Sequence, residues 1–426
     1  MEVKFFLNSY QLTISDILKL YRWAERLLRK MVKAAIMGFG VVGSGVYEIL
    51  KNNAESIAKK AGEKIEVGYI LDIRDFSGHE DAHLFTKSFD DILNDDDVKI
   101  VIEVMGGLTP AYDYTKKALL AGKNVVTSNK ELVATHGCEL LKIAKEKNVN
   151  YMFEASVGGG IPIIRPMNVC MAANNIKEIY GILNGTTNFI LTKMFKEGES
   201  FPDALAEAQR LGYAERNPEA DVEGFDACRK IAILSSLASG KYINYKDILT
   251  EGITKITKTD VHFAEENGYV IKLIGYADLS GGKVFARVSP MLIPLSCQLA
   301  NVDDVFNAIL LDSDYLGEAV FYGRGAGMLP TASAVCADVI DCAKHVNINR
   351  SISWTDEGNS FIVKAEDTIN KYFVRTNDAS LAEKFVGSKI LGEKDGETVF
   401  ITEAIPEKDF MLIADGKCSY IRVMDR

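Results

Sequence analysis

From residue 31 onward, short apolar runs alternate with longer segments whose apolar residues recur at helical spacing. The runs predict strands at VKAAIM, which follows Met31, and at 65–71, 100–104, 124–127 and 151–154. The longer segments predict helices at 42–61, 88–94, 110–121 and 130–147. Strands that alternate with helices form βαβ units, so this pattern predicts a parallel sheet with helices on both faces.

The rest of the chain is mixed. A long helix is expected after Asp221, to about residue 239, with strands near 179–183 and 284–290. A glycine turn and a helical run lie near 320–345. From about residue 370 the pattern reads β-α-β-β-α-β, which suits a ferredoxin-like fold.

The chain is therefore expected to be an α/β protein of four segments. A Rossmann-type domain would be followed by an α+β domain and by a short ferredoxin-like domain. The predicted boundaries are 1–30 for a helical extension, 31–160 for the dinucleotide-binding domain (completed by about 320–348), 161–320 for the α+β domain, whose catalytic and dimerisation roles are implied only by the family resemblance given below, and 350–426 for the last domain.

Residues 13–30 predict an amphipathic helix, with Ile17, Leu20 and Leu27 at helical spacing and Ser15 or Asp16 as a cap. Its arginines interrupt any signal-peptide core. Two interpretations stay open: an added helix, or a start codon assigned too far upstream. Contact with a membrane is the less favoured reading of this basic helix.

Composition narrows the classes of partner. The 426 residues include 49 Lys and Arg against 59 Asp and Glu, a net charge of −10 that argues against nucleic acid as a partner. The seven cysteines form no CxxC pair, which favours a reducing compartment over a zinc site or a disulfide framework. No apolar run is long enough for a transmembrane helix. We expect a cytoplasmic protein that acts on a small molecule.

The first candidate site is the glycine turn Gly38-Phe39-Gly40-Val41-Val42-Gly43. It stands between a predicted buried strand and a predicted helix, the context that a dinucleotide-binding turn requires. The helix N-terminus would offer N–H groups and positive potential to a diphosphate. We interpret the turn as the binding site of a nicotinamide cofactor. The alternative interpretation is a βα turn without a ligand.

The end of the second strand leaves the cofactor undecided. Asp72 or Asp75 could accept hydrogen bonds from a ribose 2′-hydroxyl of NAD, whereas Arg74 could meet the 2′-phosphate of NADP. A surface ion pair is the alternative.

Charged residues supply the candidate chemistry. Lys130 follows a predicted strand, where ligands of parallel sheets bind. Asp226 and Lys230 are four residues apart, so they share a helix face, and such a lysine could give a proton to a carbonyl oxygen. Glu215 would suit a substrate ammonium, and Asp221 could cap the following helix. A solvated helix pair is the alternative.

Two glycine-rich segments complete the candidates. Residues 154–161, EASVGGGI, offer a carboxylate and glycine-freed carbonyls to a monovalent cation, or form a linker between domains. The turn at 323–327 lets backbone approach a ligand, so Gly327 joins the cofactor residues. His79 and His83 lie in a polar stretch and are read as loop residues.

Six segments together resemble the homoserine dehydrogenase family, from about Met31 to about Asp341. They are GFGVVG, VVTSNKELVA, EASVGGGIPII, NGTTNFIL, AQRLGYAERNPEADVEGFDACRK and GRGAGMLPTASAV. The resemblance implies interconversion of L-aspartate 4-semialdehyde and L-homoserine with NAD or NADP, in a homodimer formed through the middle domain.

The resemblance also assigns roles to individual residues. Lys230 would be the proton donor, Asp226 its partner, and Lys130 a charge between nicotinamide and substrate. Homoserine and a sodium ion would each have a further set of residues. These are Glu215, Asp221, Gly185 and Thr186 for homoserine, and Glu154, Val157, Gly159 and Ile161 for sodium.

The tail departs from the family pattern. Members with a regulatory ACT domain carry an Asp-Arg-Pro-Gly-like turn, where this chain reads RTNDAS at 375–380. We expect a reduced ACT-like domain without threonine feedback, and no fused kinase, for which the length leaves no room. Two rivals remain. One is a reductase with a thiolate nucleophile, Cys138 or Cys170, and the other is a non-catalytic sensor.

Overall fold

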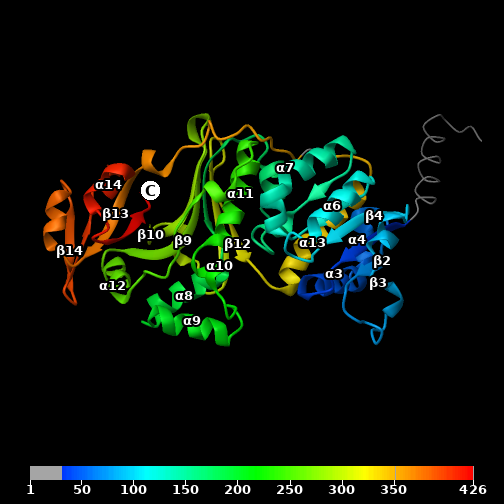
Figure 1. The fold of residues 1–426 in the computed structure, drawn as a ribbon, viewed down its shortest axis with the longest axis horizontal. Helices are drawn as coiled ribbons and strands as arrows, with labels where there is room; N and C mark the ends of the chain where they lie inside the picture. The colour runs from blue at the N-terminus through cyan, green and yellow to red at the C-terminus, as the bar shows by residue number, and fades with distance from the viewer. Residues whose placement is uncertain (1–30, 351, 426) are drawn as a thin grey trace, which may run out of the picture.

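The computed structural model describes residues 31–350 and 352–425, so the predicted helix at 13–30, with its cap at Ser15 or Asp16, lies outside the described residues. Three parts follow one another along the longest axis of the molecule (Figure 1). They are a parallel sheet with its helices, a mixed sheet, and a C-terminal part. Within the described ranges, no helix is both long and apolar enough to cross a membrane.

The first sheet has six parallel strands in the order β3-β2-β1-β4-β5-β6. This order is that of doubly wound dinucleotide-binding folds, and it reverses between β1 and β4, where such folds bind ligands. The prediction of a parallel sheet is confirmed. The strands are β1 (Val32–Met37), β2 (Ile65–Leu71), β3 (Phe85–Thr86), β4 (Val98–Glu103), β5 (Asn124–Thr127) and β6 (Tyr151–Met152).

Helices cover both faces of this sheet, and one of them comes from far along the chain. Helix α13 packs against α3 so closely that a Cβ on Gly45 would lie 3.1 Å from the Cβ of Ala332. The helical stretch predicted over 42–61 is confirmed, but Asn53 divides it into α3 and α4. The helices are α3 (Val41–Asn52), α4 (Ala54–Ala61), α5 (Phe89–Leu93), α6 (Ala111–Leu120), α7 (Lys130–Glu146) and α13 (Met328–Lys344).

A mixed sheet of eleven strands begins in the middle of the chain with the order β12-β11-β7-β9-β10 and with β8 beside β10, and it continues into strands near the C-terminus that are described below. Helices α8, α11 and α12 pack against its middle strands. These elements are β7 (Ile176–Ile182), α8 (Gly185–Lys196), α9 (Phe201–Arg210), α10 (Glu219–Val222), α11 (Phe225–Ser239), β8 (Leu249–Thr250), α12 (Lys258–Glu266), β9 (Tyr269–Asp278), β10 (Phe285–Pro294), β11 (Phe306–Ser313) and β12 (Gly317–Arg324).

The long helix expected after Asp221, to about residue 239, is confirmed as α11, and a separate short helix, α10, precedes it. Gly224 adopts a left-handed conformation, with a φ of 83°, and separates α10 from α11. The residue that precedes α11 is therefore Gly224, and the prediction that Asp221 caps this helix is wrong. Asp221 lies in α10, which frees its carboxylate for the contacts described below.

We call residues 369–423 the C-terminal module. Its four longer strands pair in the order β17-β13-β15-β14, and β17 also pairs in parallel with β10, so one sheet continues from the middle of the chain into the module. The first predicted helix of the module is a 3-10 turn at Ala379–Lys384. The other elements are β13 (Ile369–Thr376), β14 (Lys389–Lys394), β15 (Glu397–Ile401), β16 (Ile405–Pro406), α14 (Glu407–Ala414) and β17 (Ser419–Val423).

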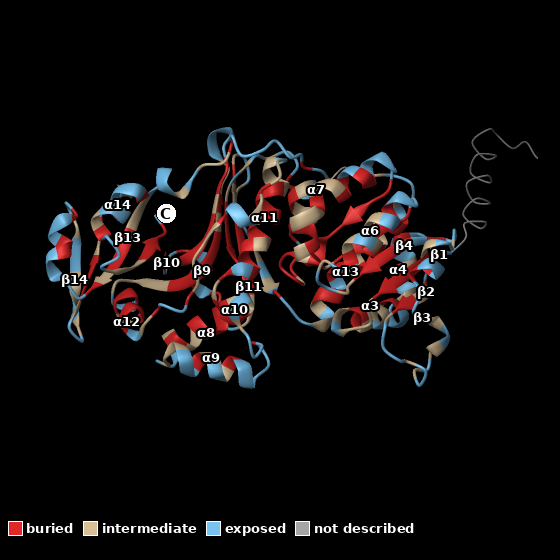
Figure 2. Ribbon diagram, viewed as in Figure 1, coloured by how far each residue is buried: buried red, intermediate tan, exposed pale blue. Residues whose placement is uncertain are grey.

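Buried residues lie in the strands and on the inner faces of the helices, while the outer helix faces are exposed (Figure 2). The connection from α13 to the module is anchored by Trp354, which is buried. Its ring lies 5.5 Å from that of Phe153, edge to face, and covers Gly137 of α7. Through this contact, the segment between α13 and the C-terminal module packs against the first part of the molecule.

Candidate active site

The glycine turn lies between β1 and α3 and has the form that a dinucleotide requires. A Cβ on Gly43 would lie 1.9 Å from the carbonyl oxygen of Gly38, so no side chain fits there, whereas a Cβ on Gly40 would meet nothing within 4 Å. Helix α3 begins without a side-chain cap or an acidic residue in its first turn. Its free N–H groups and open space at Gly40 suit a diphosphate.

Asp72 and Arg74 form one ion-paired unit at the end of β2. The Arg74 Nη2 and Nε atoms lie 2.8 and 3.0 Å from the two carboxylate oxygens of Asp72. Asp72 also accepts a hydrogen bond from the backbone N–H of Phe39, at 2.8 Å. The bonds from Arg74 hold the pKa of Asp72 well below its usual range. Asp75 points elsewhere and binds Ser77.

A cleft of about 640 Å³ opens where the first sheet meets the mixed-sheet part. Most of the predicted site residues line it, and so do several residues that were not predicted to have a binding or catalytic role. The predicted ones are Val42, Lys130, Gly159, Gly185, Thr186, Glu215, Asp221, Asp226, Lys230 and Gly327, and the others include Ser128, Asn184, Tyr213, Arg324 and Thr331.

The Asp226 carboxylate is the centre of the polar network in this cleft. Its Oδ2 lies 2.7 Å from Nζ of Lys230, one helical turn away on α11, and its Oδ1 lies 2.7 Å from Nζ of Lys130, the first residue of α7. Lys230 also donates to the carbonyl of Leu183, at 2.7 Å. The structure thus brings both predicted lysines to one carboxylate.

Burial and charge set the protonation of these groups. Burial alone would raise the pKa of Asp226, but the charges of Lys230 and Lys130 outweigh it and hold that pKa below its usual range. Burial is the largest influence on Lys230 and lowers its pKa below 10.5, with Asp226 opposing. Burial would also lower the pKa of Lys130, but Asp226 outweighs it and raises that pKa. Of the two lysines, Lys230 is thus the one that gives up its proton more easily.

Asn184 is a site residue that our sequence analysis missed. Its Nδ2 donates to Asp221 Oδ1 at 2.7 Å and to Asp226 Oδ2 at 2.9 Å, so one amide holds two carboxylates together. Its Oδ1 accepts from the N–H of Thr187 and caps α8. The signal was present in NGTT, because asparagine is a preferred helix N-cap.

Four residues predicted to bind substrate surround the same end of the cleft. Burial raises the pKa of Asp221, whereas Glu215 is exposed at the rim. Thr186 donates to the carbonyl of Tyr213, at 2.7 Å. A Cβ on Gly185 would lie 2.7 Å from the Val305 carbonyl, so only glycine allows this approach. Carboxylates and backbone carbonyls in one place suit a small ligand that carries an ammonium group.

The predicted cation residues lie in the loop after β6. The Glu154 carboxylate is buried and accepts hydrogen bonds from the N–H groups of Ile163, Ile164 and Arg165, at 2.5 to 2.8 Å. It therefore caps the short helical segment that follows. Gly159 is in a left-handed conformation, with a φ of 55°, and lines the cleft. The loop offers the oxygen ligands that a cation site requires, although three backbone N–H groups already donate to its Glu154 carboxylate.

The thiolate rival has no support in this geometry. Cys138 is half-buried on α7, where its Sγ lies 3.7 Å from the Trp354 carbonyl and burial raises its pKa. Cys170 is exposed, and neither cysteine lines the cleft. His79 packs its ring against Phe39 in a turn. Over residues 31–350 and 352–425, no three His, Cys, Asp or Glu side chains form a metal-binding group.

Comparison with protein families matches two models to this chain. Residues 38–154 match the model "Homoserine dehydrogenase, NAD binding domain", and residues 162–340 match the model "Homoserine dehydrogenase". Among curated proteins, a homoserine dehydrogenase of Neisseria gonorrhoeae is 44% identical over 319 residues, 74% of this chain and 73% of that protein. One from Lactococcus lactis is 41% identical, over 82% of this chain and 84% of that protein.

Solved structures agree with these matches. A homoserine dehydrogenase from Thiobacillus denitrificans superposes with a TM-score of 0.84 at 36% identity, over 93% of this chain and 99% of that one. A hyperthermophilic archaeal homoserine dehydrogenase, solved in complex with NADPH, superposes with a TM-score of 0.64 at 30% identity. This superposition covers 74% of this chain and 98% of the archaeal chain. The likeness therefore extends over both the glycine turn and the cleft.

The open space at Gly40 generates a prediction. We expect Gly40→Ala to leave the thermal midpoint of the free protein unchanged, because the added methyl meets no atom. We expect cofactor affinity to fall by about tenfold or more, because the methyl occupies the space that a diphosphate needs. Calorimetric titration with NADP and with NAD measures this, and unchanged affinity for both would contradict it.

Proposed function

Since the chain belongs to the homoserine dehydrogenase family, we propose that the cleft around Asp226 is its active site, where homoserine and NAD or NADP react. The protein is an NAD(P)-dependent oxidoreductase of that family. One observation carries the assignment of the site. A buried carboxylate holds two lysine ammonium groups in a cleft that is also lined by Val42, at the start of the helix following the glycine turn.

Lys230 is the proton-transfer group of this proposal. A nicotinamide held at the glycine turn would supply the hydride acceptor for the carbon that bears the homoserine hydroxyl, and that carbon would become the aldehyde carbon of L-aspartate 4-semialdehyde. Lys230, as a neutral amine, takes the hydroxyl proton, and in the reverse direction its ammonium returns that proton to the oxygen. Asp226 positions Lys230, and Lys130 adds positive charge where negative charge develops on oxygen. Glu215 and Asp221 bind the α-ammonium, beside Gly185 and Thr186.

The remaining roles divide along the chain. Residues 31–160, completed by 320–348, hold the cofactor through Gly38–Gly43, Lys130 and Gly327, with Arg74 or Asp72 at the ribose. Residues 161–320 carry catalysis, and 350–426 form a reduced ACT-like domain. A cytoplasmic location fits seven free cysteines. Recovery of the native protein in a membrane fraction would contradict that location.

Removing the proton-transfer group tests the mechanism. We expect Lys230→Ala to lower kcat for homoserine oxidation by about 10²-fold or more. The matched control is Lys193→Ala on α8, whose ammonium pairs with Glu197 on the surface, and which should keep the wild-type rate. Cofactor reduction followed at 340 nm with each of NAD and NADP measures both variants. A near-wild-type rate for Lys230→Ala would remove the proposed role.

The pH profile separates proton transfer from a structural effect. Homoserine oxidation needs the neutral amine, and burial lowers the pKa of Lys230 below 10.5. The wild-type kcat should therefore rise with pH and level off below pH 10.5, whereas reduction of the aldehyde should show the opposite trend. The rise should be missing from the residual activity of Lys230→Ala.

A monovalent cation, sodium, is the second part of the proposal. Hard cations take oxygen ligands, and Val157, Gly159 and Ile161 would supply backbone carbonyls beside Glu154. Because three N–H groups already engage the Glu154 carboxylate, the carbonyls would hold most of the ion's coordination. A bound cation would fix the loop that lines the cleft at Gly159.

A salt exchange tests the cation site without an activity assay. We expect a higher thermal midpoint in sodium chloride than in choline chloride at equal ionic strength, because a ligand that binds only the folded state stabilises it. Glu154→Gln should reduce this difference. Equal midpoints of the wild-type protein in the two salts would argue against a cation site.

A homodimer formed through the mixed sheet completes the proposal. Among the strands of residues 31–350 and 352–425, β12 is an edge strand without a neighbour on its outer side, and Val320, Tyr322 and the preceding Leu316 are 39, 56 and 56% exposed. Apolar residues on a free edge are typical of an interface. We expect sedimentation equilibrium to give twice the chain mass, and the mass of one chain at micromolar concentration would contradict the proposal.

A further inference from the structure

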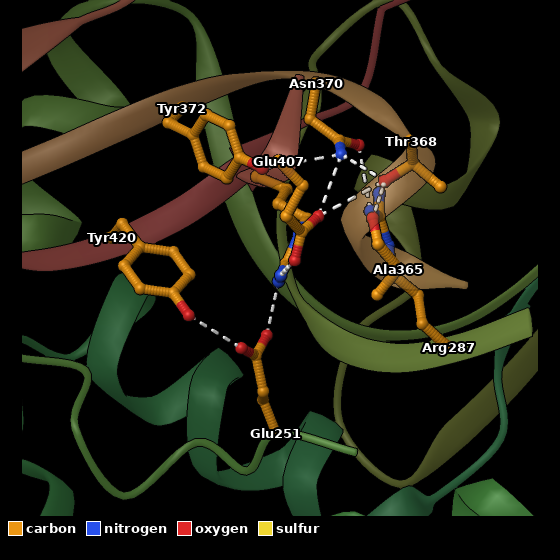
Figure 3. A network of polar contacts seen from close by, with 9 residues as sticks. Glu251, Arg287, Ala365, Thr368, Asn370, Tyr372, Glu407 and Tyr420 are labelled. Carbon is orange, nitrogen blue, oxygen red and sulfur yellow. Dashed lines mark hydrogen bonds and ion pairs between the residues drawn. The ribbon is translucent and has the colours of Figure 1, made fainter. Parts of the chain in front are cut away.

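A buried arginine of the C-terminal module is held by carboxylates from two parts of the chain. Arg422 on β17 is 1% exposed and pairs with Glu407 inside the module and with Glu251 outside it. The hydroxyl of Tyr420 donates to the second oxygen of Glu251, at 2.9 Å. Figure 3 shows the Glu251 carboxylate facing this hydroxyl, below the cluster around Glu407. Glu251 is thus fixed by the module through its side chain.

The backbone at Glu251 packs against the turn that precedes α11. Glu251 follows β8, and the N–H of Ile253 donates to the Val222 carbonyl at 2.9 Å. A Cβ on Gly252 would lie 2.3 Å from that carbonyl oxygen and 2.6 Å from the Cα of Glu223. This contact leaves no free space, so a shift of residues 251–253 must move the turn.

The same turn carries the substrate end of the active site. Asp221 lies immediately before it, and the N–H of Gly224 donates to the Asp221 carbonyl at 3.0 Å. Asp226 follows in the first turn of α11. Gly224 itself touches Thr250, because a Cβ there would lie 3.2 Å from the Thr250 Cγ2. Residues on both sides of Glu251 thus support the segment that holds Asp221 and Asp226.

We propose that Glu251 is a positioning residue for homoserine binding, through which the C-terminal module fixes the carboxylates of Asp221 and Asp226. This inference rests on the proposed function, which takes Asp221 as a ligand of homoserine. The module supports the substrate end of the cleft, whereas the glycine turn before α3 lies in the first part of the molecule, on the far side of the middle part from the module (Figure 1). Weakening the Glu251 contact therefore changes homoserine binding without changing cofactor binding.

A second ion pair of similar design provides a matched control. Arg375 on β13 pairs with Glu397 inside the module and with Asp260 on α12, 2.8 Å away. Asp260 is buried, and its hydrogen bonds are with Arg375 and Thr257. Glu251→Gln and Asp260→Asn each remove one charge that joins the module to the rest of the chain, and each leaves the arginine its partner inside the module.

The test is steady-state kinetics of homoserine oxidation on the full chain, with thermal midpoints measured alongside. We expect Glu251→Gln to raise KM for homoserine by about threefold to tenfold and to leave KM for the cofactor within about twofold. Asp260→Asn should lower the thermal midpoint and leave both KM values within about twofold. Gly252→Ala tests the mechanical contact itself and should also raise KM for homoserine.

The outcomes separate this inference from the proposed function. Unchanged KM for homoserine in both Glu251→Gln and Gly252→Ala would overturn it, and so would an equal rise in both KM values, which indicates general loosening. If Asp221→Asn leaves KM for homoserine unchanged, the assignment of the substrate site fails instead. A rise with Asp221→Asn but not with Glu251→Gln or Gly252→Ala would reject only the role of Glu251.

Discussion

The buried carboxylate of Asp226 is the contact on which the active cleft depends. Lys130 reaches it from the parallel-sheet part and Lys230 from the helix that packs on the mixed sheet, each at 2.7 Å. An isolated buried charge is costly, because it loses its hydration. The three charges compensate one another only while the two parts of the molecule stay together. The relative position of the two sheets is therefore also a condition for the protonation states of the site.

A similar constraint acts at the other end of the molecule. Arg422 is enclosed by two carboxylates, and its strand continues the mixed sheet by pairing with β10. Because a buried arginine needs its partners, the C-terminal module cannot rotate freely against the middle of the chain. The module is part of the sheet that carries the active-site helices, which gives it a structural connection to the substrate end of the cleft.

The local pattern of apolar residues predicted the positions of helices and strands well, but it predicted poorly where helices are interrupted. The apolar runs placed β2 and β5 at the residues where the structure has them, because a buried parallel strand is apolar on both faces. Asn53 interrupts a helical stretch whose periodicity continues across it, and the pattern did not reveal that the short helix α10 precedes Gly224. Asn184 was missed because its cap signal lies in a polar turn, and its second role appears only when α8 meets α10 and α11.

The sequence by itself determined the parallel sheet, the glycine turn and the Asp226–Lys230 pair, since each depends on spacing within one element or between neighbouring ones. Only the tertiary structure decided that Lys130 shares the same carboxylate, that Glu154 caps a helical segment, and that Glu251 faces Arg422. The two partners of such a contact lie far apart in the sequence, or other donors compete for the same acceptor. Which charges meet is fixed by the packing of sheets and helices, because desolvation penalises every arrangement that leaves a buried charge unpaired.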